Sequence, residues 1–261
     1  GGNGCRRGCF SPWLMDMTTE PAFDIKICGL STQADIATAM AGGASMIGLV
    51  FFAKSPRNVT LDQAEKLAAS ARLDGHRRIE IVALMVNPDD DELAAIVTRI
   101  RPDIVQLHGT EPASRVAEIK LTHGVEVMKA LGVREAADLS GLKPYASVAD
   151  RLLIDAKPPK NSVLPGGNGL TFDWSILDAL TARMCGGLPV MLSGGLNPNN
   201  VARAVALSKR HPVISGIDVS SGVETSPGIK DKGLIEIFLQ RTKAAALSPS
   251  SRNEYSHDPA S

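Results

Sequence analysis

Cys28 is the first residue whose type and position could support chemistry. It ends DIKIC (residues 24–28), a run in which polar and apolar side chains alternate, and Gly29 follows it directly. Such alternation predicts a β-strand, so the thiol would lie at a strand end. A cysteine beside isoleucines is usually an inert buried thiol; a redox, metal-binding or catalytic thiol is the alternative. These residues alone leave the choice open.

Asp155 is the second such residue, because it stands near the end of the apolar run LLIDA (152–156). Its carboxylate could simply pair with Arg151 or Lys157. Alternatively, partial burial would raise its pKa and let it act as a general acid. Cys28 would then be the base, provided that its pKa is lowered. An acid and a base on either side of a sugar phosphate are what an isomerisation requires.

Three further polar residues follow apolar runs. Arg57 lies in a loop with Lys54, and a planar guanidinium is the preferred donor to a carboxylate. A solvated basic loop is the alternative interpretation. Gln106 and His108 could line a pocket or cap the rim of the fold, and we take both as substrate-binding residues.

Two segments have the composition of a phosphate site. SGGLNPNN (193–200) contains Gly194 and Gly195, and DVSSGVE (218–224) contains Ser220, Ser221 and Gly222. Glycine backbones, hydroxyls and free N–H groups together can hold an anion. Isolated tight turns would explain each segment separately, but both patterns in one chain favour a phosphate site.

The elements that must position these residues alternate along the chain. Short apolar runs predict strands at 24–28, 45–52, 79–86, 102–108, 125–132, 151–156, 188–195 and 213–219. Amphipathic segments predict helices at 31–42, 61–73, 89–100, 111–121, 134–142, 172–182, 198–209 and 231–242. This repeat predicts an α/β protein with a single (β/α)8 TIM barrel, whose site lies at the carboxyl ends of the strands. A doubly wound sheet is disfavoured because no G-x-G-x-x-G follows the first strand.

Composition and charge exclude several classes of protein. Of the 261 residues, 44% are hydrophobic, and 28 basic side chains balance 28 acidic ones. We therefore expect no nucleic-acid partner and, without a long apolar run, no membrane segment. The four cysteines and five histidines lack metal spacing, and so few cysteines indicate a reducing, cytoplasmic location. Residues 1–22 are expected to be a disordered leader or a cloning remnant, 23–243 the barrel, and 244–261 a disordered tail.

Taken together, several strings resemble phosphoribosylanthranilate isomerase, a (β/α)8 enzyme family of tryptophan biosynthesis. They are KICGL (26–30), GLVFFAKSPRNV (48–59), VQLHG (105–109), LLIDA (152–156), GGNGLTFDW (166–174), LSGGLNPNNV (192–201) and DVSSGVETSPGIKD (218–231). They occur in the order found in the family and span nearly the whole expected domain.

The resemblance implies an Amadori rearrangement of N-(5′-phosphoribosyl)anthranilate to 1-(2-carboxyphenylamino)-1-deoxyribulose 5-phosphate, without metal or organic cofactor. It places the general acid at Asp155 and the general base at Cys28. The arginine for the anthranilate carboxylate falls on Arg57, and the phosphate loops fall on Gly194-Gly195 and Ser220-Ser221-Gly222. The family also implies a monomer or a homodimer.

Two alternatives remain beside this expectation. Another sugar-phosphate barrel, such as an aminoaldose isomerase, indole-glycerol-phosphate synthase or pentose-phosphate epimerase, would use two carboxylates, a lysine or a metal. A catalytically silent phosphosugar-binding module would bind without turnover. The presence of both Cys28 and Asp155 disfavours each of them.

Overall fold

The computed structural model describes residues 23–73, 79–157 and 174–248. Eight parallel strands form a closed barrel in the order β1 to β8, with β1 paired to both β2 and β8. The strands are β1 (Asp24–Cys28), β2 (Met46–Phe51), β3 (Glu80–Met85), β4 (Ile104–Leu107), β5 (Glu126–Val133), β6 (Arg151–Ala156), β7 (Val190–Ser193) and β8 (Ile214–Val219). The single (β/α)8 barrel predicted from the sequence is confirmed.

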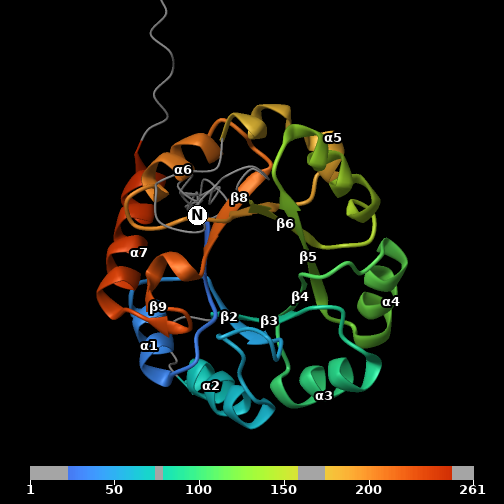
Figure 1. Ribbon diagram of the computed structural model, residues 1–261, viewed down its shortest axis with the longest axis vertical. Helices are drawn as coiled ribbons and strands as arrows, with labels where there is room; N and C mark the ends of the chain where they lie inside the picture. The colour runs from blue at the N-terminus through green and yellow to red at the C-terminus, as the bar shows by residue number, and fades with distance from the viewer. Residues whose placement is uncertain (1–22, 74–78, 158–173, 249–261) are drawn as a thin grey trace, which may run out of the picture.

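A ring of helices surrounds the barrel (Figure 1). They are α1 (Gln33–Ala41), α2 (Leu61–Leu73), α3 (Asp90–Ile100), α4 (Ala113–His123), α5 (Ala182–Cys185), α6 (Val201–Ser208) and α7 (Lys232–Leu247). Three of the helices begin with a side-chain cap. The hydroxyl of Thr32 and the carboxylates of Asp89 and Asp231 accept hydrogen bonds from N–H groups in the first turns of α1, α3 and α7. The large apolar core lies between this ring and the barrel.

Two of the predicted helices were wrong in type. Residues 134–142 were expected to be an α-helix, but the segment is the 3-10 helix η1 (Ala136–Tyr145), which contains Pro144. Proline has no N–H for an α-helical bond, so it disfavours that conformation. In place of a helix over 172–182 there are the 3-10 helix η2 (Trp174–Ala179) and α5, separated at Thr181 by extended backbone; residues 172 and 173 lie outside the described ranges.

The C-terminal boundary was also placed too early. α7 continues to Leu247, whereas the tail was expected to start at residue 244. An elongated last helix is reasonable because residues 243–247, KAAAL, are strong helix formers. The remainder of the expected tail and the expected leader lie outside the described residues, as does most of the string at 166–174.

A small element after β8 was not expected at all. The 3-10 helix η3 (Ser221–Val223) leads into a two-stranded antiparallel hairpin of β9 (Glu224–Ser226) and β10 (Ile229–Lys230). In the ring of Figure 1 this hairpin lies near α1 and α7. It precedes α7, so it belongs to the connection from the last strand to the last helix.

The inside of the barrel is layered. An apolar layer consists of Met46, Val82, Ile104, Met128, Ala130, Leu153 and Met191. Because successive side chains of a strand point to opposite faces, the residues two positions further along these strands also point inward. That next layer includes Gln106 after Ile104, Asp155 after Leu153 and Ser193 after Met191. The strand period therefore turns polar side chains inward at the carboxyl end of the barrel.

Candidate active site

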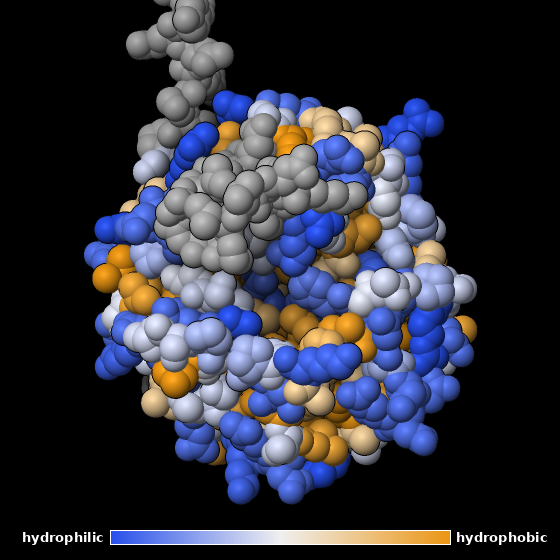
Figure 2. All heavy atoms as spheres, viewed as in Figure 1, coloured by the Kyte–Doolittle hydropathy of each residue, from blue (hydrophilic) through white to orange (hydrophobic). Residues whose placement is uncertain are grey.

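A cavity of about 580 Å³ opens at this end of the barrel. Its apolar wall contains Val50, Phe52, Leu84 and Val86. Its polar lining comes from six of the strand ends and the loops after them: Cys28, Ser55, Arg57, His108, Asp155, Lys157, Ser193, Gly194, Gly195, Asp218, Ser220 and Ser221. Viewed along the barrel axis, the molecule is hollowed at the centre of the ring (Figure 2). The volume and the mixed lining of the cavity suit one small molecule with an apolar part and charged groups.

Cys28 lies at the end of β1 with its side chain turned into the cavity. It is paired in register with Gly48 of β2, where an added Cβ would lie 2.7 Å from the Cys28 sulfur. A side chain at position 48 would therefore displace the thiol. The thiol is free and only 3% of the residue is exposed. Cys28 thus combines the burial of a core residue with a position on the cavity wall.

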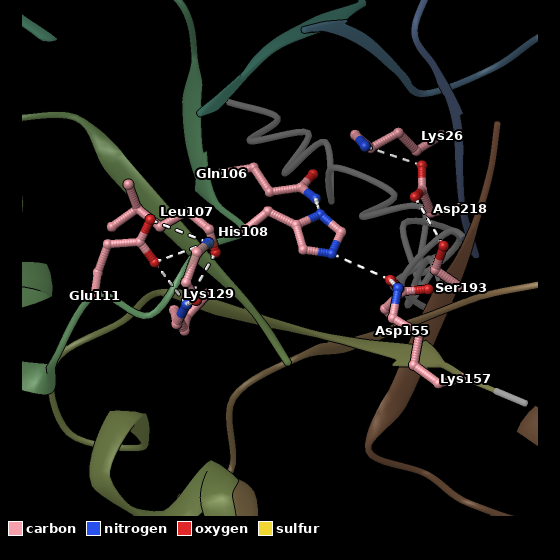
Figure 3. Close-up of polar contacts among 11 residues, drawn as sticks. Lys26, Gln106, Leu107, His108, Glu111, Lys129, Asp155, Lys157, Ser193 and Asp218 are labelled. Carbon is pink, nitrogen blue, oxygen red and sulfur yellow. Dashed lines mark hydrogen bonds and ion pairs between the residues drawn. The ribbon is translucent and has the colours of Figure 1, made fainter. Parts of the chain in front are cut away.

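A buried ion pair lies beside Cys28. Lys26, two residues earlier on the same face of β1, donates from Nζ to Asp218 Oδ1 at 2.9 Å, and Ser193 Oγ donates to Asp218 Oδ2 at 3.0 Å (Figure 3). Burial raises the pKa of the Cys28 thiol, and Asp218 raises it further, against the lowering effect of Lys26 and Lys230. The lowered pKa, on which the interpretation of Cys28 as a base was conditional, is therefore not found.

Asp155 lies at the end of β6 and also lines the cavity. His108 Nε2 lies 3.1 Å from its Oδ2, and Lys157 Nζ donates to the same oxygen. Burial by itself would raise the pKa of Asp155, but the His108 hydrogen bond and the Lys157 charge outweigh burial and hold this pKa below its ordinary value. The raised pKa of the general-acid interpretation is therefore not found, and the pairing with Lys157, the other interpretation, is part of the site.

Gln106 and His108 separate into two roles. His108 lines the cavity, but Gln106 is fully buried and lies behind it, with Nε2 3.4 Å from His108 Nδ1 (Figure 3). A direct contact of Gln106 with substrate, expected from the sequence, does not fit this position. The reason is that His108, two residues further along the chain, stands between Gln106 and the cavity.

Arg57 reaches the cavity from the loop after β2. Its Nε and Nη2 donate to Glu224 Oε1 and Oε2 at 2.7 and 2.6 Å. Glu224, at the start of β9, also accepts from Lys230 Nζ at 2.7 Å. The alternative of a solvated basic loop does not apply to Arg57, because its guanidinium is held in a bidentate ion pair.

The two expected phosphate loops lie together at the cavity. Gly194 and Gly195 have positive φ angles of 93° and 63°, a left-handed conformation that favours glycine. Among the described residues, no atom beyond its two chain neighbours lies within 4 Å of a Cβ built on Gly195. Gly222 is not among the cavity residues; a Cβ there would lie 1.8 Å from the carbonyl oxygen of Leu196, so this glycine lets the two loops pack closely.

Lys26, Asp218, Glu224 and Lys230 were missed as site residues. Lys26 and Asp218 stand at strand positions whose side chains point into the barrel, as that of Cys28 does. A charged residue at such an inward position could have identified them as site residues from the sequence. Glu224 and Lys230 offered no such signal because their hairpin was not expected.

A second buried ion pair, between Lys129 and Glu111 at 2.7 Å, lies outside the cavity. Lys129 Nζ also donates to the carbonyls of Leu107 and Gly109, on either side of His108 (Figure 3).

Among the described residues, no group of three histidine, cysteine or acidic side chains could hold a metal ion. No helix in those ranges is long and apolar enough to cross a membrane.

Comparison with known proteins gives a consistent result. The family model described as N-(5'phosphoribosyl)anthranilate (PRA) isomerase matches residues 25–241. The N-(5'-phosphoribosyl)anthranilate isomerase of Rhizobium meliloti is 50% identical over 222 residues, 85% of this chain and 98% of that protein. The crystal structure of phosphoribosyl anthranilate isomerase from Thermotoga maritima is 31% identical, with a TM-score of 0.70 over 85% of this chain and 98% of that one. Another crystal structure of such an isomerase, in complex with reduced 1-(o-carboxyphenylamino)-1-deoxyribulose 5-phosphate, is 28% identical, with a TM-score of 0.68 over the same shares.

Proposed function

The chain belongs to the N-(5′-phosphoribosyl)anthranilate isomerase family of tryptophan biosynthesis, and from this premise we propose that Asp155 and Cys28 are the general acid and general base of its reaction. The reaction is an aldose–ketose isomerisation, an Amadori rearrangement. The observation that carries the proposal is that a carboxyl group on β6 and a thiol on β1 line one cavity beside two glycine-rich loops.

In the acid step, Asp155 gives its proton to the ring oxygen of the phosphoribosyl group. The C1′–O bond breaks with its electrons staying on that oxygen, and the nitrogen lone pair forms a C1′=N⁺ Schiff base. Because the pKa of Asp155 is lowered in the ligand-free protein, the acid form must be favoured by the substrate. The phosphate and carboxylate charges of the substrate act in this direction, since nearby negative charge raises the pKa of a carboxyl group.

In the base step, the Cys28 thiolate takes the proton from C2′. The C–H electrons form C1′=C2′ and those of C1′=N⁺ return to nitrogen, which gives an enolamine. Loss of the C2′ hydroxyl proton and protonation at C1′ then give the ketone. A cationic Schiff base beside Cys28 favours the thiolate, together with Lys26 and Lys230, against the burial that raises its pKa.

The other cavity residues would bind and orient the substrate. The anthranilate carboxylate would lie against Arg57, and the phosphate against the backbone of Gly194 and Gly195 and the hydroxyls of Ser220 and Ser221. Gln106 has a supporting role in this proposal: its amide N–H donates a hydrogen bond to His108 Nδ1, which leaves the imidazole proton on Nε2, facing Asp155.

The first experiment is a fluorescence assay of phosphoribosylanthranilate generated in situ, with wild type beside Asp155→Asn and Cys28→Ala. We expect each substitution to lower kcat by about 10²- to 10⁴-fold, the usual contribution of a general acid or base. Circular dichroism checks that both variants fold. Near-normal turnover by either folded variant would remove that residue from the mechanism.

Catalysis without metal or organic cofactor, a cytoplasmic location, and a monomeric or homodimeric state belong to this proposal. To test catalysis without a metal, the protein is dialysed against a chelator before the assay, and we expect unchanged turnover. Light scattering on the purified protein decides the last.

A further inference from the structure

The contacts of Arg57 restrict how it can meet an anion. Glu224 occupies the Nε and Nη2 positions of the guanidinium in a two-bond fork, at 2.7 and 2.6 Å. A guanidinium is planar and carries five N–H donors in fixed directions. Glu224 holds one edge of the guanidinium, and no residue in the described ranges bonds to Nη1, so we take the Nη1 edge as the one that meets a ligand in the cavity.

Glu224 is itself held in place. Its side chain is 3% exposed, and it accepts from the fully buried Lys230 at 2.7 Å and from the Gly228 backbone N–H at 3.2 Å. A Cβ at Gly228 would lie 2.4 Å from the Pro56 carbonyl oxygen, so the hairpin packs directly on the loop that carries Arg57. The Glu224 carboxylate is therefore held rigidly. Arg57 is the longer side chain, 21% exposed, and Glu224 orients it.

The same cluster reaches the expected phosphate loop and β1. Lys230 Nζ donates to the Ser220 carbonyl at 2.9 Å, and Ser220 Oγ donates to the Cys28 carbonyl at 3.1 Å. A continuous chain of polar contacts thus runs from Arg57 through Glu224, Lys230 and Ser220 to Cys28.

We propose that Glu224 is a positioning residue that orients Arg57 toward the substrate carboxylate and, through Lys230, fixes the spacing between the carboxylate and phosphate ends of the site. The proposal rests on the proposed function, because it takes Arg57 as the carboxylate donor. Glu224 touches no reacting atom. It acts by removing the freedom of a long side chain before the substrate arrives.

Charge and positioning predict opposite results here, which makes the proposal testable. Glu224→Gln removes a negative charge from a cavity whose ligand is a polyanion. If Glu224 acted only through its charge, the variant would bind that ligand more tightly. If it positions Arg57, binding weakens, because a glutamine offers one acceptor oxygen and cannot hold the two-bond fork.

The experiment uses a pair of inhibitors: reduced 1-(o-carboxyphenylamino)-1-deoxyribulose 5-phosphate and the same compound without its ring carboxylate. Their inhibition-constant ratio isolates the contribution of the carboxylate. In the wild type we expect the carboxylate to tighten binding by about ten- to a hundredfold, the range of a charged hydrogen-bonded pair. In Glu224→Gln this ratio should fall to within a fewfold of one, while the constant for the decarboxylated compound barely changes.

Three further variants complete the design. Arg57→Lys should lose the ratio as Glu224→Gln does, and the double variant should lose no more than either alone. Glu111→Gln is the matched control, because Glu111 is an equally buried glutamate paired with a lysine at 2.7 Å but outside the cavity; it should keep the wild-type ratio. If Glu224→Gln does not fold, Glu224→Asp replaces it, because the aspartate side chain is one carbon too short to form the two-bond fork. Its ratio of inhibition constants should fall in the same way.

The outcomes separate this proposal from the one on which it rests. If the carboxylate does not tighten binding to the wild type, or if Arg57→Lys keeps the wild-type ratio of inhibition constants, the role of Arg57 is overturned and this proposal with it. A wild-type effect that Arg57→Lys loses and the Glu224 variant keeps would overturn the positioning role alone. Tighter binding of both inhibitors by Glu224→Gln would show that only its charge acts.

Discussion

At the scale of single residues, charges and burial set the protonation of the two proposed catalytic groups. Burial raises the pKa of Cys28, while His108 and Lys157 outweigh burial to lower the pKa of Asp155. These directions favour an ionised Asp155 and a protonated Cys28 thiol at neutral pH. The proposed acid and base steps need the reverse of both states.

This reversal predicts an unusual pH dependence of Asp155→Asn. In the wild type, raising the pH by one unit forms about tenfold more thiolate and leaves about tenfold less protonated Asp155, so kcat/KM stays flat between the two pKa values. Asparagine does not titrate, so the residual kcat/KM of the variant should rise about tenfold per unit from about pH 7, above the second phosphate ionisation, to about pH 9. Steady-state kinetics across this range make the measurement.

Cys28→Ala is the complementary variant, since it retains only the acid. Its residual kcat/KM should fall with pH over the same range, as protonated Asp155 is depleted. Profiles of both variants that run parallel to the wild-type profile would contradict the acid and base assignments, whatever the size of the rate loss.

At the scale of elements, strand periodicity was sufficient to place most of the site. Cys28, Asp155 and His108 reach the cavity because they stand at the inward positions of strands whose ends the sequence marks with glycine or proline. Glu224 and Lys230 could not be placed, because β9 and β10 are too short to show periodicity. The pKa directions of Cys28 and Asp155 were also beyond the sequence, since that of Cys28 depends on Asp218 and Lys230, which lie near the other end of the chain.

The loop after β7 allows a matched test of backbone conformation. Gly194 and Gly195 both have positive φ, but a Cβ at Gly194 would lie 2.2 Å from the Ala156 carbonyl oxygen, while one at Gly195 meets no atom within 4 Å in the described part of the chain. Gly195→Ala should cost about 1–2 kcal/mol, the usual penalty of left-handed backbone for alanine. Gly194→Ala should cost clearly more, because a backbone atom must also move.

Urea unfolding followed by circular dichroism compares the two variants. Inhibition by inorganic phosphate adds a second comparison, in which the methyl group of Gly195→Ala should weaken binding because it enters the cavity. Equal stability losses in the two variants would show that the contact with Ala156 does not constrain this loop.

At the scale of the whole molecule, a second charged cluster lies at the opposite end of the barrel. Arg151, in the first position of β6, meets Asp24, Glu80 and Glu126 from the starts of β1, β3 and β5 at 3.1 to 3.6 Å. Burial raises the pKa of Glu80, and Asp24 and Glu126 add to this rise against the lowering by Arg151. One guanidinium thus connects four of the eight barrel strands, β6 with β1, β3 and β5.

Opposite effects on stability are expected from two substitutions in this cluster. Because the raised pKa means that folded Glu80 holds a proton more tightly than the unfolded chain does, its contribution to stability falls as pH rises through that pKa. Glu80→Gln removes this loss and should leave the protein at least as stable at neutral pH, with a flatter dependence on pH in the acidic range. Arg151→Met leaves carboxylates unpaired and should cost about 2 kcal/mol.

Urea unfolding at several pH values measures both variants. A Glu80→Gln protein less stable than wild type at neutral pH would contradict the predicted sign, and an unchanged Arg151→Met protein would show that the cluster contributes nothing to stability.

The pair of Lys26 and Asp218 has a consequence for how the chain is made. Of the eight barrel strands, β1 emerges first from the ribosome and β8 last, yet each supplies one member of the pair, and β1 lies between β2 and β8. Any barrel that closed on fewer strands would enclose an ammonium group without its carboxylate, at a cost of several kcal/mol. Premature closure during synthesis is thereby disfavoured, and the cavity that contains Cys28 forms only when the eighth strand has been translated.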